Sequence, residues 1–72
     1  METEDLSFQK DELPEDRSLI IVDDDRAFLQ RLARAMETRG FDVRSAHSIA
    51  EGIELIRAQA PAFAVVDMRL ED

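Results

Sequence analysis

Three aspartates that follow two apolar runs are the residues of this chain best suited to chemistry. Asp23 and Asp24 come directly after the apolar residues 19–22, and Asp67 ends a second apolar run at residues 62–66. Adjacent carboxylates repel one another, so an acidic cluster favours a bound cation, and hard oxygen ligands favour Mg²⁺. One carboxylate held beside such an ion could also act as a nucleophile toward phosphorus.

The same acids also have a purely structural interpretation. Asp25, the third acid of the first run, could simply cap the helix that follows, and Asp67 could be an ordinary turn residue. For Asp25 alone the cap is the better explanation. For the whole cluster we favour the metal site, because three adjacent anions call for a cationic partner.

The sequence pattern predicts the elements that must position these acids. Four apolar residues at 19–22 suit a strand that is covered on both faces, as in a parallel sheet. Asp25 is then a plausible cap for a helix over residues 26–39, and Gly40 is placed to end it in the left-handed conformation. The residues expected to pack this helix against the sheet are Phe28, Leu32 and Met36.

A second strand and a second helix follow before the last apolar run. Residues 41–46 alternate between apolar and polar types, which is typical of a half-exposed edge strand. Ser48 and Glu51 have the spacing of a capping box, and Pro61 prevents the helix that they begin from continuing. Gly52 weakens this helix by up to about 1 kcal/mol relative to alanine. The residues expected to form its buried stripe are Ile49, Ile53, Ile56 and Ala60.

This order of elements predicts an α/β fold with a parallel sheet. Short connections and right-handed crossovers place the alternating strand at one edge, which gives the strand order second, first, third. The carboxyl ends of the first and third strands then lie roughly 5 Å apart. We therefore expect Asp24 and Asp67 to share one ion. His47, at the end of the second strand, is assigned no chemistry, since a lone histidine there is more often a surface residue.

The composition restricts the function classes. The 72 residues, 44% hydrophobic and 36% charged, fit one small globular domain. The net charge of −8 argues against direct nucleic-acid binding, and no apolar stretch is long enough for a membrane span. The absence of cysteine excludes thiolate metal sites and is consistent with a reducing cytosol. Residues 1–18 are rich in acids without a sustained apolar period, so we expect a disordered acidic leader before a domain at residues 19–72.

Taken together, these motifs resemble a known family. The run at residues 22–25, the step of 43 positions from Asp24 to Asp67 and the βαβαβ pattern are similar to the receiver domain of two-component response regulators. Within that family, the ending at residues 65–72 resembles the redox-responsive RegA/PrrA/ActR regulators. The resemblance implies a doubly wound, flavodoxin-like parallel sheet that is truncated after its third strand. It also implies a cytoplasmic signalling module rather than an enzyme.

The resemblance further implies roles for four residues. Asp67 matches the aspartate that accepts a phosphoryl group from a sensor histidine kinase. Asp24 matches the direct ligand of Mg²⁺, and Asp23 matches the acid that usually reaches the ion through water. Arg69 matches the position whose backbone carbonyl completes the coordination, so no role of its side chain is implied. The full-length parent is expected to be a redox-responsive transcriptional regulator.

The sequence also departs from the family pattern, because it stops soon after the third strand. The family's switch Ser or Thr after a fourth strand and its Lys after a fifth have no counterpart here, and no helix-turn-helix follows. We therefore expect weak phosphorylation, and self-association or poor folding through the uncovered third strand at residues 62–66. The alternative function is an interaction fragment that is not phosphorylated. A phosphatase-like enzyme is disfavoured, because Arg69 stands where a second acid would be needed.

Overall fold

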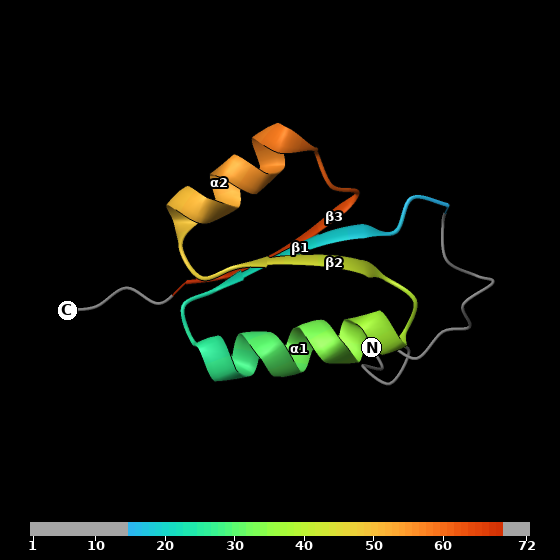
Figure 1. Ribbon diagram of the computed structural model, residues 1–72, viewed down its shortest axis with the longest axis horizontal. Coiled ribbons are helices and arrows are strands. Elements are labelled where there is room, and N and C mark those ends of the chain that lie inside the picture. The colour runs from blue at the N-terminus through green and yellow to red at the C-terminus, as the bar shows by residue number, and fades with distance from the viewer. Residues whose placement is uncertain (1–14, 69–72) are drawn as a thin grey trace, which may run out of the picture.

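The computed structural model describes residues 15–68, so residues 1–14 of the disordered leader predicted for residues 1–18 lie outside the described part of the chain, as does the predicted ligand Arg69. At its other end the predicted leader reaches one residue too far, because Ser18 is buried and begins the first strand. Residues 15–68 form a three-stranded sheet between two helices (Figure 1). The elements in chain order are β1 (Ser18–Asp23), α1 (Arg26–Thr38), β2 (Asp42–Ala46), α2 (Ile49–Ala58) and β3 (Phe63–Asp67).

The sheet confirms the predicted topology. Its strands are parallel and their order is β2-β1-β3, with Leu19 of β1 facing Val43 of β2 on one side and Phe63 of β3 on the other. Since all three strands run in the same direction, their carboxyl ends reach the same edge of the sheet. The two helices cover opposite faces (Figure 1). Neither helix that the structure describes is long and apolar enough to cross a membrane.

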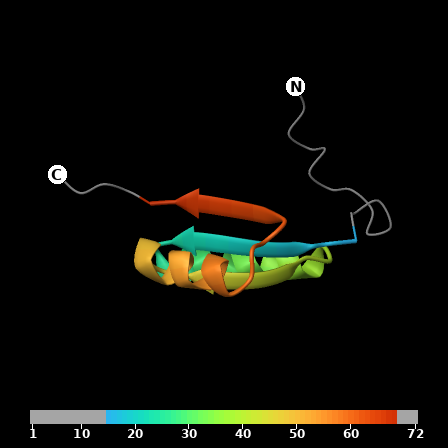
Figure 2. The ribbon, with the colours of Figure 1, turned by 90° about the horizontal axis from the view of Figure 1, so that it is seen from above.

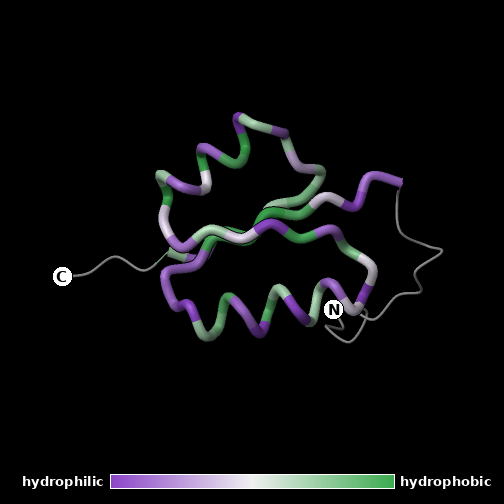
Figure 3. Tube along the Cα trace, viewed as in Figure 1, coloured by the Kyte–Doolittle hydropathy of each residue, from purple (hydrophilic) through white to green (hydrophobic). Residues whose placement is uncertain are grey.

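β1 forms the core of the molecule because both of its faces are covered. All six of its residues are buried, which explains the continuous apolar run that Figure 3 shows in the middle of the sheet. Alternate side chains of β1 enter two separate apolar clusters, one against each helix. The cluster on the α1 face contains Leu19, Ile21, Leu29 and Phe41, and the cluster on the α2 face contains Ile20, Val22 and Ala46.

β3, in contrast, is exposed along its whole length. Neither helix contacts it, and Figure 2 shows both helices on the β1–β2 side of the sheet. Val66 keeps 58% of its surface exposed, and Phe63 keeps 39% despite an edge-to-face ring contact with Phe41 at 5.6 Å. The predicted exposed apolar strand is therefore confirmed, while the self-association expected from it stays a prediction.

Both helices begin at the predicted caps. Asp25 Oδ1 accepts a hydrogen bond from the backbone N–H of Phe28 at 3.1 Å, and Ser48 Oγ accepts one from the backbone N–H of Glu51 at 3.1 Å. Glu51 also reaches back, but its Oε1 accepts from the backbone N–H of His47 at 3.0 Å, one residue before the cap. The capping box thus ties the end of β2 to the first turn of α2.

The buried face of α1 differs in part from the prediction. Gly40, just after the helix, has a φ of 102°, the left-handed conformation predicted for its end. Leu32 and Met36 pack against the core as predicted, although both are only half-buried. The prediction that Phe28 packs on the sheet is wrong, because its side chain is 38% exposed and Leu29 is buried instead. The helix lies over β1 and β2 without contacting β3, and this position selects the Leu29 side.

The buried stripe predicted for α2 is also wrong. Its isoleucines are 40–48% exposed, and Ala60 lies beyond the helix end and is exposed. The sheet-facing side carries Gly52, which is buried, and Leu55, which packs against the core. A Cβ on Gly52 would lie 2.9 Å from Val22 Cγ2, so the glycine lets α2 approach β1 closely. The isoleucines therefore do not form the most buried side of the helix.

Arg44 of β2 forms hydrogen bonds with the C-terminal end of α2. Its guanidinium donates hydrogen bonds to the backbone oxygens of Leu55 at 3.2 Å and Gln59 at 2.9 Å. Leu55 O also accepts the backbone N–H of Gln59 at 3.1 Å, so Arg44 is a second donor to this oxygen, and a positive charge near the last carbonyls of a helix is favourable. Sequence spacing gave no sign of this contact, which joins residues 11 and 15 positions apart.

Candidate functional site

Two of the predicted site residues lie side by side at the carboxyl edge of the sheet. Asp23 ends β1 and Asp67 ends β3, and the two residues are register partners in the parallel pairing. Partners in such a ladder direct their side chains to the same face of the sheet. By the alternation of β1, that face is the one that carries Leu19 and Ile21, against α1.

Asp23 is buried and its orientation is fixed. Only 4% of its surface is exposed, and its Oδ1 accepts a hydrogen bond from the backbone N–H of Asp25 at 2.8 Å. This bond closes the turn between β1 and α1. Because Asp25 caps the helix with its own side chain, the structural interpretation of Asp25 is confirmed. The three adjacent acids therefore have different positions: one is buried, one is exposed and one caps a helix.

The remaining carboxylates of the predicted site are open to solvent. Asp24, in the turn after β1, and Asp67, at the end of β3, are both exposed. Within residues 15–68, no group of three or more His, Cys, Asp or Glu side chains is gathered closely enough to hold a metal ion as the side chains stand. The shared ion of Asp24 and Asp67 therefore stays a prediction, as does the contribution of Arg69, which lies outside the described residues.

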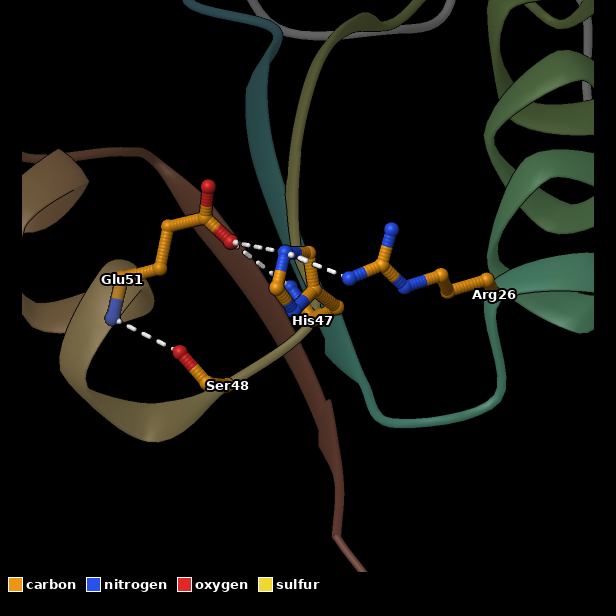
Figure 4. A network of polar contacts seen from close by, with 4 residues as sticks. All are labelled: Arg26, His47, Ser48 and Glu51. Atoms are coloured by element: carbon orange, nitrogen blue, oxygen red, sulfur yellow. Dashed lines mark hydrogen bonds and ion pairs between the residues drawn. The ribbon is translucent and has the colours of Figure 1, made fainter.

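The same edge carries a polar cluster that sequence reasoning missed. Arg26, the first residue of α1, extends its guanidinium to the ring of His47, which follows β2, and Glu51 of α2 lies on the other side of that ring (Figure 4). Residues 21 positions apart give no periodic signal. The available hint was that Arg26 follows the acidic run directly and that His47 follows a parallel strand, so both had to lie at the carboxyl edge.

The sequence of this folded part matches one family. Residues 19–72, well over half of the chain, match the family described as the response regulator receiver domain. The chain belongs to this family. The predicted family is thereby confirmed, and the partial parallel fold with strand order 2-1-3 agrees with it. A receiver domain is a component of two-component signalling systems and is a signalling protein rather than an enzyme.

Within the receiver family, the chain is similar to curated regulatory proteins named RegA and ActR. The photosynthetic apparatus regulatory protein RegA of Cereibacter sphaeroides is 59% identical over 69 residues, which cover 96% of this chain and 36% of that protein. RegA of Rhodobacter capsulatus is 57% identical over 61 residues, covering 85% of this chain and 33% of the relative. The acid tolerance regulatory protein ActR of Rhizobium meliloti (strain 1021) is 61% identical over 57 residues, covering 79% and 29%.

This receiver chain spans about a third of the length of the curated relatives that it matches. What those whole proteins do is therefore a property of longer chains. No solved structure matches the chain.

Proposed function

We propose that this receiver chain accepts a phosphoryl group on Asp67, delivered by a sensor histidine kinase, with Mg²⁺ as the cofactor. The observation that carries the proposal is the pairing of Asp23 with Asp67 at the carboxyl edge, in a chain that belongs to the receiver family. Open parallel α/β sheets bind their ligands at this edge.

The exposure of Asp67 suits it to act as the nucleophile. One carboxylate oxygen attacks phosphorus as the P–N bond of a phosphohistidine breaks, so a P–O bond forms and the imidazole leaves with the electron pair of the old bond. A donor as large as another protein requires an acceptor that is open to solvent, and Asp67 at the end of an uncovered strand meets this need.

The donor set fits a hard divalent cation. Carboxylate and carbonyl oxygens are the ligands that Mg²⁺ prefers, and Asp24 and Asp67 would supply direct ligands together with the backbone carbonyl of Arg69. Asp23, whose Oδ1 is already bonded to a backbone N–H, suits contact through water. A bound Mg²⁺ would neutralise the charge that carboxylate and phosphoryl oxygens otherwise concentrate at one edge. The exposed acids have the rotational freedom to turn onto the ion.

The longer parent is proposed to be a cytoplasmic, redox-responsive transcriptional regulator. The support is the similarity to regulatory proteins whose names refer to the photosynthetic apparatus and to acid tolerance. In such a protein the receiver would control an output located elsewhere in the longer chain, and its partner would be a cognate sensor histidine kinase.

A phosphorylation assay with matched acid variants tests the proposal. The chain is incubated with a radiolabelled acyl phosphate donor, with Mg²⁺ or with a chelator, and the label bound to protein is measured. We expect label that requires Mg²⁺ and that falls strongly in Asp24→Asn. Asp42→Asn is the control, because Asp42 is an exposed acid at the amino end of β2. Equal labelling with and without Mg²⁺, or equal loss in both variants, would contradict the proposal.

A second function, self-association, is favoured by one specific observation. All five residues of β3 are exposed, and its outer edge has no strand partner among the described residues. Unpaired edges of this kind readily pair with other chains. Sedimentation velocity on the 72-residue chain and on Val65→Lys decides this point: a dimer that becomes a monomer in the variant supports self-association, and a monodisperse wild-type monomer rejects it.

A further inference from the structure

The ring of His47 stands between two groups of opposite charge (Figure 4). Its Nε2 lies 3.3 Å from Nη2 of Arg26 and 3.4 Å from Oε1 of Glu51. Arg26 comes from the first turn of α1, and Glu51 comes from the first turn of α2. The cluster therefore joins the starts of two helices that cover opposite faces of the sheet.

One ring nitrogen cannot bond to both neighbours at the same time. Without a proton, Nε2 is an acceptor and can take a hydrogen bond only from the Arg26 guanidinium. With a proton, it is a donor and can bond only to the Glu51 carboxylate, while the imidazolium repels Arg26. The two nearly equal distances place Nε2 within reach of either partner.

The strand order links the bonding partner of His47 Nε2 to the carboxylates at the same edge of the sheet. β1 is the central strand, so His47 after β2 and Asp67 at the end of β3 lie on opposite sides of it. Arg26 follows Asp24 by only two residues, and contact with His47 draws its guanidinium toward β2. A guanidinium released from His47 is a mobile cation on a long side chain beside the carboxylates.

We propose that His47 is a positioning residue that controls the access of Arg26 to the acidic edge. Neutral His47 with its proton on Nδ1 accepts from Arg26 at Nε2, which holds the guanidinium on the β2 side and leaves Asp24 and Asp67 available to Mg²⁺. Protonated His47 pairs with Glu51 and releases Arg26, which then competes with the ion for the same carboxylates. This inference rests on the proposed function, because it assigns the carboxylates to Mg²⁺.

The inference predicts how acidity acts on the site. The charged groups in contact with the ring are Arg26 from α1 and Glu51 from α2. Histidine is the side chain whose charge responds most readily to mild acid. Mg²⁺ binding should therefore weaken in the wild-type chain as acid is added, through the release of Arg26.

Mg²⁺ titrations by calorimetry test the control that His47 exerts. We expect His47→Ala to weaken binding roughly two- to fivefold at neutral pH, as suits an exposed ionic competitor. His47→Gln, whose amide oxygen accepts from Arg26 without titrating, should restore the neutral affinity and remove its decline in acid. Adding Arg26→Gln to His47→Ala should recover the affinity, whereas adding Arg31→Gln, which removes an equal charge from the same helix, should not.

A second readout needs no metal. In the wild-type chain the side-chain N–H resonance of Arg26 should shift between about pH 7.5 and about pH 5.5, and in His47→Gln it should stay constant. Circular dichroism confirms that each variant is folded. Equal Mg²⁺ affinity in wild type and His47→Ala, or an Arg26 resonance that ignores pH, overturns the inference and leaves the proposed function standing. Failure of every chain to bind Mg²⁺ overturns the proposed function, and the Arg26 resonance still decides whether His47 holds the guanidinium.

Discussion

Asp23 and Asp67 are register partners at the carboxyl ends of the adjacent strands β1 and β3, although 44 positions separate them in the sequence. Asp23 is buried and bonded to a backbone N–H, whereas Asp67 is open to solvent. One acid of the pair is therefore fixed by the fold and the other is accessible to a partner. This contrast suits a site in which a rigid carboxylate stands beside a reactive one.

The first prediction concerns the side of α1 that is buried against the sheet, which carries Leu29 and not Phe28. Leu29→Ala should lower the free energy of unfolding by about 2–5 kcal/mol, because Leu29 is buried in the cluster against β1. Phe28→Ala removes a larger side chain that is 38% exposed, and it should cost clearly less. Urea denaturation of both variants checks the order. A larger loss in Phe28→Ala would restore the helix orientation that the spacing suggested.

The strand pattern was a better guide than the helix pattern for a physical reason. A continuous apolar run and an alternating run differ in how many faces are covered, and together with right-handed crossovers this placed β1 in the middle and β2 at an edge. The run of β3 is equally continuous, but β3 is exposed at the other edge of the described sheet. The isoleucines of α2, in contrast, have helical spacing but stay 40–48% exposed. The close approach at Gly52 decides which side does, and a pattern of apolar residues does not register a missing side chain.

Gly52 makes a second prediction that opposes helix propensity. Alanine is favoured over glycine within a helix by up to about 1 kcal/mol. At this site, however, the new methyl group would meet Val22 Cγ2 at 2.9 Å, and overpacking of a core typically costs about 1–3 kcal/mol. Gly52→Ala should therefore destabilise the chain. Thermal unfolding followed by circular dichroism measures the change.

The control for this prediction shortens Val22, the side chain that the new methyl group would meet. Val22→Ala destabilises the chain by itself, but it clears the space that the new methyl group needs. Gly52→Ala should consequently cost less in the Val22→Ala background than in the wild type. A stabilising effect of Gly52→Ala in the wild-type background would show that α2 shifts freely and that the close contact does not constrain it.

A third prediction concerns acid stability at the start of β1. Ser18 donates from Oγ and from its backbone N–H to Asp16 Oδ1, at 2.7 and 3.1 Å, and these bonds lower the pKa of the Asp16 carboxyl below its usual value. A lowered pKa in the folded chain means that the stabilisation is complete at neutral pH and is lost as the pH falls through the acid range. Asp16→Asn should therefore differ most from wild type near neutrality, and the difference should shrink in acid.

The matched variant for this pH effect is Ser18→Ala. It removes the hydroxyl donor to Asp16 and also the acceptor for the backbone N–H of Ala62 at 2.9 Å. It should lower stability at every pH and reduce the acid dependence as well. Urea denaturation from neutral to acidic pH gives both quantities. An unchanged acid dependence in Ser18→Ala would assign the effect to a different carboxyl group.

The candidate site was only partly predictable from the sequence. Parallel strands of known order must bring their carboxyl ends together, so Asp23 and Asp67 could be placed from the pattern alone. The different environments of Asp23, Asp24 and Asp25 could not be predicted from the pattern, because they depend on a turn in which Asp25 caps the helix. The meeting of Arg26 with His47 depends on side-chain reach across β1, which sequence spacing does not report.

The position of the phosphoryl group on the phosphorylated chain tests the account most directly. The chain is treated with an acyl phosphate donor and Mg²⁺, digested, and analysed by mass spectrometry to locate the modified residue. We expect a single acid-labile acyl phosphate on Asp67, absent from Asp67→Asn and retained in Asp42→Asn. Phosphate on another residue of the wild-type chain, or undiminished phosphate in Asp67→Asn, would contradict it.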